Sequence, residues 1–274
     1  MGREEGDDRV SEYSLSQIGY AALSRIWAPF AAIPYGNRHC VICRRRLGRF
    51  LPFEGGLRDA PKLMIALDCI GSDVDNFACP WCRCHDRERH LFLYMSRTGL
   101  FDEMQGKVVV HFAPERRLTG IIADARPARH IKCDLFPKGA DVQREDLLDM
   151  SFPSGSVDLF IANHVMEHVD DDRRAIEEIV RVLKVGGQAI LQTPFSPVLT
   201  RTWDDAGIVS GAARLQAYGQ ADHVRLYGRD IADRFAAFGL SPRVRSHDDV
   251  LADIDARAVG VNPREPFLLF ERRA

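Results

Sequence analysis

The sequence has few of the features that commit a chain to a membrane, to nucleic acid or to an extracellular disulfide scaffold. Its 274 residues hold 37 Lys and Arg against 39 Asp and Glu, a net charge of −2. The overall charge therefore gives no electrostatic attraction to nucleic acid or acidic lipid. No apolar run approaches the roughly 20 residues of a membrane-spanning helix, and the acidic start "MGREEGDDRVSEYS" is unlike a secretory signal peptide. No internal repeat is present. These absences indicate a globular cytoplasmic protein without a membrane partner, whose seven cysteines are expected to bind metal or stay free rather than pair.

Cysteine is concentrated between residues 36 and 84, where two Cys-x-x-Cys pairs stand 35 residues apart, Cys40 with Cys43 and Cys79 with Cys82. Four thiolates close a tetrahedral zinc site, which leaves no open position and therefore predicts a structural metal. Redox chemistry is the alternative for Cys-Pro-Trp-Cys, but the strand and helix that such a motif requires are missing and a second pair has no redox role. Neighbouring side chains that could replace one ligand are Cys69, Cys84, His39 and His85.

After residue 106 apolar strands alternate with amphipathic helices. Strands are expected at 107–112, 128–135, 157–165, 188–195 and 266–273, and helices at 114–125, 170–184 and 230–240. Gly186-Gly187 is expected to close the second of these helices, because glycine tolerates a left-handed C-terminal cap. Further helical segments are expected at 13–33 and 86–104. This order predicts an α/β fold with a doubly wound, Rossmann-like, mostly parallel sheet and helices on both faces.

Polar residues at the carboxyl ends of these strands are the candidate ligand-binding groups, since such folds bind ligands there. Asp134 ends the second strand 23 residues after His111, the spacing at which an acid binds the ribose of a nucleoside. Asp146 lies in the next loop and would read an adenine amino group, while Asn163 and His164 follow the third strand. For both acids the alternative is a solvated loop residue or a helix cap.

His164 and His168 stand four residues apart with Glu167 between them, a spacing that could bind metal on one helical face. The glutamate is not in the position that zinc peptidases use, and the sequence shows no third ligand. A histidine here also suits general-base work on a hydroxyl or amine. The alternative for each is a structural histidine in the turn after the strand.

The run from residue 146 to 195, "DLLDMSFPSGSVDLFIANHVMEHVDDDRRAIEEIVRVLKVGGQAILQTPF", resembles the core of class I S-adenosylmethionine-dependent methyltransferases, of the widespread methyltransferase type 11-like branch. Three further stretches resemble a subset that carries an N-terminal four-cysteine zinc-binding module: Cys79–His90, His111–Glu115 and Asp222–Gly228. The resemblance covers residues 37–274. It implies a seven-stranded sheet, a zinc-binding module (37–95) with its linking helix, and the methyltransferase domain (96–274) with an inserted lid at about 196–227. The helical segment that apolar spacing predicts at the N-terminus (1–36) precedes them.

By position the resemblance also implies a cofactor site for S-adenosylmethionine, with S-adenosylhomocysteine as product. The loop His111–Glu115 would pass beneath the methionine end of the cofactor, with Glu115 holding its amino group. Of the small residues that normally let the backbone approach a cofactor, only Ala113 is present. The full set of cofactor residues that the resemblance and the strand ends give is His111, Phe112, Ala113, Glu115, Asp134, Asp146, Leu147 and Asn163.

Methyl transfer needs an aligned nucleophile and, for a hydroxyl or protonated amine, a base. His164 and His223 are the candidates for base or orienter, and Arg225 for a contact to an anionic acceptor group. The alternative for Asp222–Arg225 is an ion-pair network that fastens the inserted segment. Trp203, Tyr218 and Tyr227 would line the acceptor pocket.

Three functions follow from the sequence. The favoured one is methylation of a hydroxyl, carboxylate or amine of a small molecule, possible in secondary metabolism. The second is an rRNA methyltransferase with a zinc finger, although "RHCVICRRRLGRF" is the only strong basic run and makes nucleic acid a weak expectation. The third is a non-catalytic zinc-stabilised binding protein. The oligomeric state is open, a homodimer included.

Overall fold

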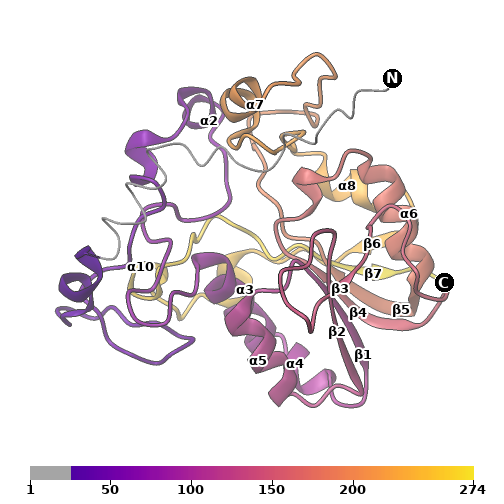
Figure 1. The fold of residues 1–274 in the computed structure, drawn as a ribbon, viewed down its shortest axis with the longest axis horizontal. Coiled ribbons are helices and arrows are strands. Elements are labelled where there is room, and N and C mark those ends of the chain that lie inside the picture. Colours follow the sequence, from indigo (N-terminus) through magenta and orange to yellow (C-terminus); the bar gives the residue numbers. More distant parts are fainter. Residues whose placement is uncertain (1–25) are drawn as a thin grey trace, which may run out of the picture.

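The computed structural model describes residues 26–274, and its centre is a seven-stranded sheet with the strand order β3-β2-β1-β4-β5-β7-β6 (Figure 1). The strands are β1 (Val108–Phe112), β2 (Arg129–Asp134), β3 (Gln143–Arg144), β4 (Val157–Ala162), β5 (Leu183–Ile190), β6 (Leu240–Pro242) and β7 (Leu269–Arg272). Strands β1 to β5 pair in parallel, and β7 runs antiparallel to both β5 and β6. The predicted mostly parallel, doubly wound sheet is therefore observed as a mixed sheet.

Both faces of the central strands are buried, which explains their nearly continuous apolar sequences. Val110 of β1 and Phe160 of β4 point into one core, whereas Val109 and Leu159 point into the other. Successive side chains of a strand alternate between faces, so each strand contributes to both cores.

Helices cover both faces of the sheet (Figure 1). On one face the apolar sides of α3 (Asp86–Arg97), α4 (Leu100–Glu103) and α5 (Arg116–Asp124) enclose the core that holds Val109. On the other face, α6 (Asp172–Val182) and α8 (Ile231–Ala236) enclose the core that holds Val110. The remaining short elements are η1 (Gly56–Asp59), α2 (Lys62–Ala66), η2 (Met166–His168), α7 (Gly211–Tyr218), α9 (His247–Val250) and α10 (Ala256–Val259).

Two predicted element boundaries are wrong. Helix α6 ends at Val182 with an extended C-cap at Leu183, so Gly186-Gly187 lies within β5 instead of closing the helix. The predicted helix at 86–104 is divided into α3 and α4 by Gly99, whose φ of 79° is left-handed and incompatible with a continuous helix. The prediction for 13–33 lies mostly outside the described residues, but residues 26–32 are helical.

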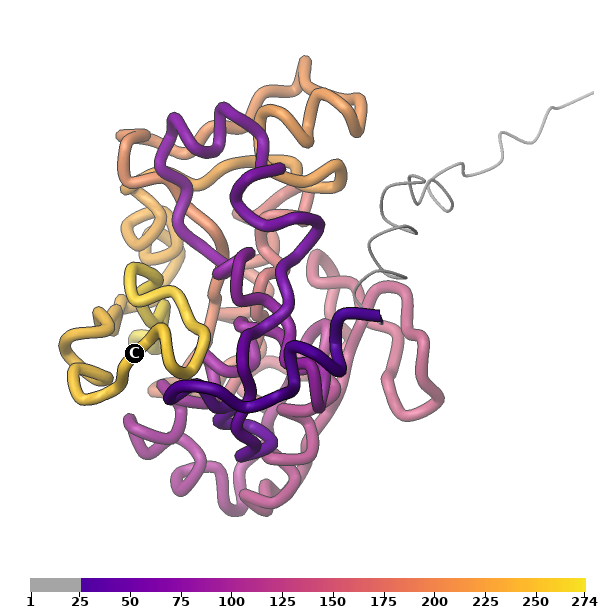
Figure 2. Tube along the Cα trace, turned by 90° about the vertical axis from the view of Figure 1, so that its left-hand side faces the viewer, coloured from indigo at the N-terminus to yellow at the C-terminus, as the bar shows by residue number. Residues whose placement is uncertain are grey.

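The cysteine-rich segment packs against the C-terminal part of the chain (Figure 2). The His39 N–H donates to the Ala258 carbonyl, and the buried Arg89 guanidinium of α3 donates to the carbonyls of Val259 and Gly260. The same guanidinium lies over the ring of Phe50. Arg89 therefore fastens the cysteine-rich segment, α3 and the α10 region to one another.

The segment predicted as an insertion, 196–227, contains α7 and packs beside α2 (Figure 2). Met64 of α2 and Tyr218 of α7 share a small apolar cluster with the partly buried Trp203. Among the described residues, no helix has the length and apolar character that crossing a membrane requires.

Candidate functional site

The polar residues predicted to follow the strands meet at one edge of the sheet. Phe112 of β1 pairs with Cys133 of β2 and with Ala162 of β4, so the next residues, Ala113, Asp134 and Asn163, emerge side by side. The strand order reverses between β1 and β4, and such a switch point is where open α/β sheets bind ligands.

The loop between β1 and α5 turns sharply at Ala113. Its φ of 46° is left-handed, a conformation that strains any residue with a Cβ, and its small side chain is exposed. The Ala113 N–H is held by the Cys133 carbonyl at 2.8 Å. The loop thus presents backbone and a single methyl group to the sheet edge.

Glu115 connects this loop with β4. One carboxylate oxygen lies 2.7 Å from His111 Nε2, and the other accepts a hydrogen bond from the Asn163 amide. Burial acts to raise the pKa of Glu115, but the hydrogen bonds from His111 and Asn163 prevail and lower it. The side chain keeps 15% of its surface exposed, so an ionised carboxylate faces the edge.

Asp134 and Asp146 each cap a local turn with one oxygen. Asp134 Oδ1 accepts the Phe136 N–H at 2.8 Å, and Asp146 Oδ1 accepts the Leu148 N–H at 2.9 Å. Leu147 is buried in the core between them and α6. Each acid thus holds a local turn with one carboxylate oxygen, and its second oxygen lies outside these turns.

His164 lies between two buried carboxylates. Its Nδ1 is 3.2 Å from Glu167 Oε1, and its Nε2 is 3.4 Å from Glu265 Oε1. Burial and the Arg87 charge act to lower the pKa of His164, but the two glutamates prevail and raise it. His164 lies in the turn after β4 with a left-handed φ of 56°, so its backbone is strained.

His223 and His168 approach the other side of Glu167. The His223 Nδ1 lies 2.9 Å from the Tyr218 carbonyl, and its Nε2 lies 4.0 Å from Glu167 Oε1. The two imidazole rings meet edge to face with centroids 4.7 Å apart. His168 Nδ1 is 3.3 Å from Asp222 Oδ2. Burial lowers the pKa of His223 to about 4, so this imidazole is neutral near pH 7.

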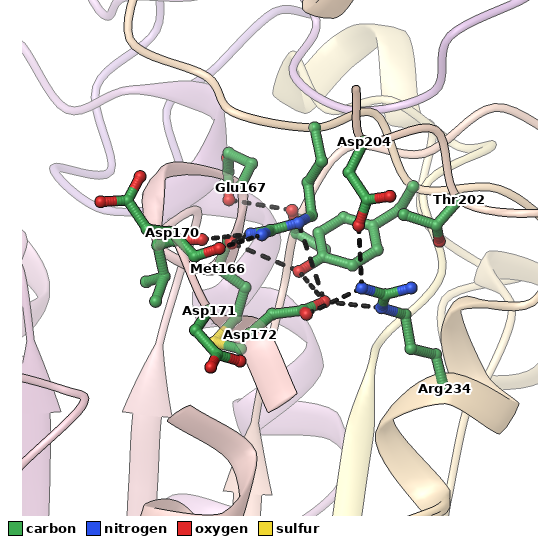
Figure 3. A network of polar contacts seen from close by, with 12 residues as sticks. Met166, Glu167, Asp170, Asp171, Asp172, Thr202, Asp204 and Arg234 are labelled. Atoms are coloured by element: carbon green, nitrogen blue, oxygen red, sulfur yellow. Dashed lines mark hydrogen bonds and ion pairs between the residues drawn. The ribbon is translucent and has the colours of Figure 1, made fainter. Parts of the chain in front are cut away.

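Arg225 is engaged by the protein itself. Its guanidinium donates to the carbonyls of Met166, Val169 and Asp170, and only 4% of the residue is exposed. Figure 3 shows the neighbouring Asp172, which accepts two hydrogen bonds from Arg234 at 2.7 and 2.8 Å and one from the Tyr227 hydroxyl at 3.0 Å. These contacts correspond to the fastening network that was the alternative to a substrate contact for Arg225.

The three aromatic residues predicted to line an acceptor pocket differ in their exposure. Tyr218 and Tyr227 are buried, and the Tyr218 hydroxyl accepts the Asp205 N–H. Trp203 is half-buried and meets the Tyr218 ring edge to face. Of the three aromatic residues, Trp203 is therefore the one that keeps exposed surface.

The four predicted metal ligands form one cluster. The Sγ atoms of these residues all lie within 4.8 Å of one another; the residues are Cys40, Cys43, Cys79 and Cys82. Two of the separations are 3.8 Å, between Cys40 and Cys82, and 3.9 Å, between Cys43 and Cys79. A tetrahedral site with zinc–sulfur bonds of about 2.3 Å requires sulfur separations of about 3.8 Å. The cluster therefore fits zinc.

The backbone of both Cys-x-x-Cys pairs has the same local fold. The N–H of Arg44 donates to the Cys40 carbonyl, and the N–H of Arg83 donates to the Cys79 carbonyl. Both arginines have a left-handed φ, 61° and 62°. A fifth thiol, Cys84, lies 3.4 Å from the Cys40 sulfur, whereas Cys69 belongs to the separate cluster beside α2 and α7.

Sequence reasoning missed Glu265 and the part played by Glu167. Glu265 stands 101 residues after His164 in the chain yet lies against its Nε2 and against His90. The order of the residues contains no signal for this contact, because the loop before β7 brings Glu265 to the site. Glu167 was visible in "NHVMEHV", and its complete burial could not be read there.

Comparison with known proteins gives a family match for part of the chain. Residues 105–191 match the family described as "Methyltransferase domain". A curated relative from Mycolicibacterium smegmatis, named as a probable S-adenosylmethionine-dependent methyltransferase, is 26% identical over 145 residues, which are 53% of this chain. The chain spans about half of that relative's length, 52%.

Solved structures similar to the chain have low identity and low TM-scores. A Mesorhizobium loti S-adenosylmethionine-dependent methyltransferase is 16% identical with a TM-score of 0.45, covering 65% of this chain and 96% of its own. The Burkholderia thailandensis 1,6-didemethyltoxoflavin-N1-methyltransferase, solved with 1,6-didemethyltoxoflavin and S-adenosylhomocysteine, is 10% identical with a TM-score of 0.45, covering 69% and 79%.

The matched residues 105–191 hold β1 to β5, α5 and α6, and with them every side chain predicted to bind the cofactor. Residues 105–191 are thus similar to a methyltransferase domain, and about half of the chain is similar to a probable S-adenosylmethionine-dependent methyltransferase.

Proposed function

We propose that the protein transfers a methyl group from S-adenosylmethionine to a hydroxyl, carboxylate or amine of a small molecule. The observation that carries the proposal is the convergence of Ala113, Asp134 and Asn163 at the switch point of the sheet, within the segment that matches the methyltransferase family. When bound, the cofactor supplies an activated methyl group, so the protein's task is to align the acceptor with it.

The side chains at this edge suit the three chemical parts of the cofactor. The ionised Glu115 suits its ammonium group, with His111 and Asn163 holding the carboxylate in place. Asp134 suits the ribose hydroxyls, since it ends the strand next to β1. Asp146 and Leu147 suit the adenine, one as an acceptor and the other as an apolar surface.

Base catalysis is assigned to His223 rather than His164 within this proposal. His223 is neutral near pH 7, because burial holds its pKa at about 4, and its Nε2 has no hydrogen-bond partner. The raised pKa of His164 and its two glutamates suit an orienting role. Arg225 is assigned to the support of this turn through the three carbonyls that it binds.

The acceptor class is tested by a methyl-transfer screen with the full chain and radiolabelled S-adenosylmethionine. Phenols, carboxylates and amines are offered in parallel with transcribed rRNA. We expect label in one of the small molecules. Label in RNA alone would replace the small-molecule acceptor with nucleic acid, and turnover by a His223→Gln variant equal to that of the parent would contradict the assigned base.

We also propose that Cys40, Cys43, Cys79 and Cys82 bind a structural zinc ion. The sulfur separations and the paired backbone turns support this ion, and no oxygen or nitrogen ligand is needed to complete the site. Metal binding and folding are coupled in such modules. Elemental analysis is expected to give about one zinc per chain and Cys40→Ser to lower both zinc content and the melting temperature. Less than about half an equivalent, with Cys40→Ser equal to the parent, would contradict the site.

A further inference from the structure

A buried carboxylate and two imidazoles converge beyond the cofactor edge, between the turn after β4 and the segment that precedes β6. One oxygen of Glu167 and one ring nitrogen of each of His168 and His223 lie within 4.8 Å of one another. Glu167 has no exposed surface and His223 has 3%, whereas the His168 side chain is 31% exposed. The cluster is therefore buried on two sides and open at His168.

The atoms that face one another in this cluster are electron-pair donors without a proton between them. His223 Nδ1 lies 2.9 Å from the Tyr218 carbonyl, which can only accept, so Nδ1 carries the hydrogen and the Nε2 of the neutral ring presents a lone pair. Among the described residues, Glu167 Oε1 and His223 Nε2 are both buried without a hydrogen bond, 4.0 Å apart, and Glu167 Oε1 also lies 3.2 Å from the imidazole Nδ1 of His164. Buried polar atoms are normally paired, so this arrangement calls for a ligand.

The surroundings of the three side chains are those that orient metal ligands. Metal-binding histidines typically donate their second ring nitrogen to a carbonyl or a carboxylate. His223 has the Tyr218 carbonyl in this position, and His168 Nδ1 has Asp222 Oδ2 at 3.3 Å. The second oxygen of Glu167 accepts a hydrogen bond from the Thr193 hydroxyl at 2.8 Å. Each side chain is thus held by a neighbouring group and offers one atom to the cluster.

We propose that Glu167, His168 and His223 bind a divalent first-row transition-metal cation, at a second metal site distinct from the four cysteines. Two imidazoles and one carboxylate are a common ligand set for such cations and leave coordination positions open. In a tetrahedral site, metal–ligand bonds of about 2.0–2.2 Å place ligand atoms about 3.3–3.6 Å apart. His223 Nε2 and Glu167 Oε1, which lie 4.0 Å apart, reach that separation by side-chain rotations that bring them closer by under about 1 Å.

The site has a consequence for the acceptor, and this step rests on the proposed function. Glu167 and His168 follow Asn163 by only a few residues, so the cation lies next to the edge assigned to methyl transfer. While the cation is bound, His223 is its ligand and not the base; the open positions of the cation would bind an acceptor through oxygen atoms and favour its deprotonated form. The acceptor class is then narrowed to molecules with two neighbouring oxygen donors, such as a vicinal diol, a catechol or an α-hydroxy acid.

The site is tested by titrating cobalt(II) chloride into the full-length, zinc-loaded protein, with calorimetry and visible absorption. We expect one equivalent of cobalt to bind without the near-ultraviolet thiolate band that replacement of zinc at the cysteines would produce. Glu167→Gln and His168→Asn are expected to weaken cobalt binding by at least about tenfold. His168→Asn keeps the test valid if Glu167→Gln fails to fold, because His168 is partly exposed.

Glu177→Gln is the matched control, since it removes one carboxylate from the exposed side of α6. It should bind cobalt like the parent. No saturable binding, a thiolate band, equal binding by the parent and both site variants, or an equal loss in Glu177→Gln would each overturn the proposal. S-adenosylhomocysteine is titrated into the same samples without cobalt. Failure of that titration would refute the methyltransferase function while the cobalt result still decides the metal site.

Discussion

Replacing Arg225 separates its two interpretations, a contact to the acceptor and a support for the turn after β4. Arg225→Met keeps most of the side-chain length and removes the charge. The change leaves the carbonyls of Met166, Val169 and Asp170 without their donor in a buried position. Hydrogen bonds to a charged group contribute about 1.5–3 kcal/mol each, and loss of a buried charged partner costs about 3–5 kcal/mol in total. We adopt the second range, because the three bonds belong to one group and are not additive.

This loss corresponds to a fall of roughly 6–20 °C in melting temperature, at about 2–4 °C per kcal/mol for a domain of this size. Thermal unfolding followed by circular dichroism measures it. Arg229→Met is the matched control, because Arg229 is an exposed arginine of the same segment and should shift the midpoint by no more than about 2 °C. A melting temperature for Arg225→Met equal to that of Arg229→Met, combined with a large loss of turnover, would refute the supporting role and restore the acceptor contact.

Two further predictions concern the loop and the network around it. Ala113→Val places a β-branched residue at a φ of 46° and fills the small exposed position. We therefore expect calorimetry to show at least tenfold weaker binding of S-adenosylhomocysteine, while Ala113→Gly retains the parent's affinity. Equal affinity of Ala113→Val and the parent would show that the loop does not contact the cofactor. Burial acts to raise the pKa of Asp172, but Arg234 and Arg225 prevail and lower it. The ionised carboxylate therefore stabilises the fold fully above the pKa of about 3.9 that it has in the unfolded chain. This stabilisation disappears as the pH falls through the lower pKa of the folded protein. The melting-temperature difference between the parent and Asp172→Asn should therefore be full at pH 7 and shrink below about pH 4, and a difference independent of pH would contradict the charge pairing.

The sheet was predictable because its strands are buried on both faces. "VVVHF" and "VDLFIA" are apolar runs bounded by polar residues, a pattern that local sequence carries. Strand β3 has two residues and β6 has three, too few for any periodicity to mark them. Gly186-Gly187 was assigned to a helix end because glycine is frequent there, whereas β5 begins at Leu183 and both glycines lie in an irregularity of its pairing with β4, between Leu183 and Gln188.

Part of the candidate site was likewise predictable from local sequence, and part depends on contacts between residues far apart in the chain. The common edge at which Asp134 and Asn163 emerge was predictable, because neighbouring parallel strands end at the same edge of a sheet. The proximity of His223 to Glu167 and His168 was not visible, since His223 reaches them only through the packing of the segment around α7. For Arg225 the sequence left a substrate contact and a fastening network open, because it cannot show the three carbonyls that the guanidinium contacts.

The proposed function depends on binding of the cofactor at the ends of β1, β2 and β4. Calorimetric titration of S-adenosylhomocysteine into the parent protein, Asp134→Asn and Asp124→Asn tests it most directly, because Asp124 is an exposed acid at the end of α5, away from the sheet edge. We expect one binding event per chain in the parent, the same affinity in Asp124→Asn and at least tenfold weaker binding in Asp134→Asn. An absence of binding to the folded parent, or equal affinity in all three proteins, would contradict it.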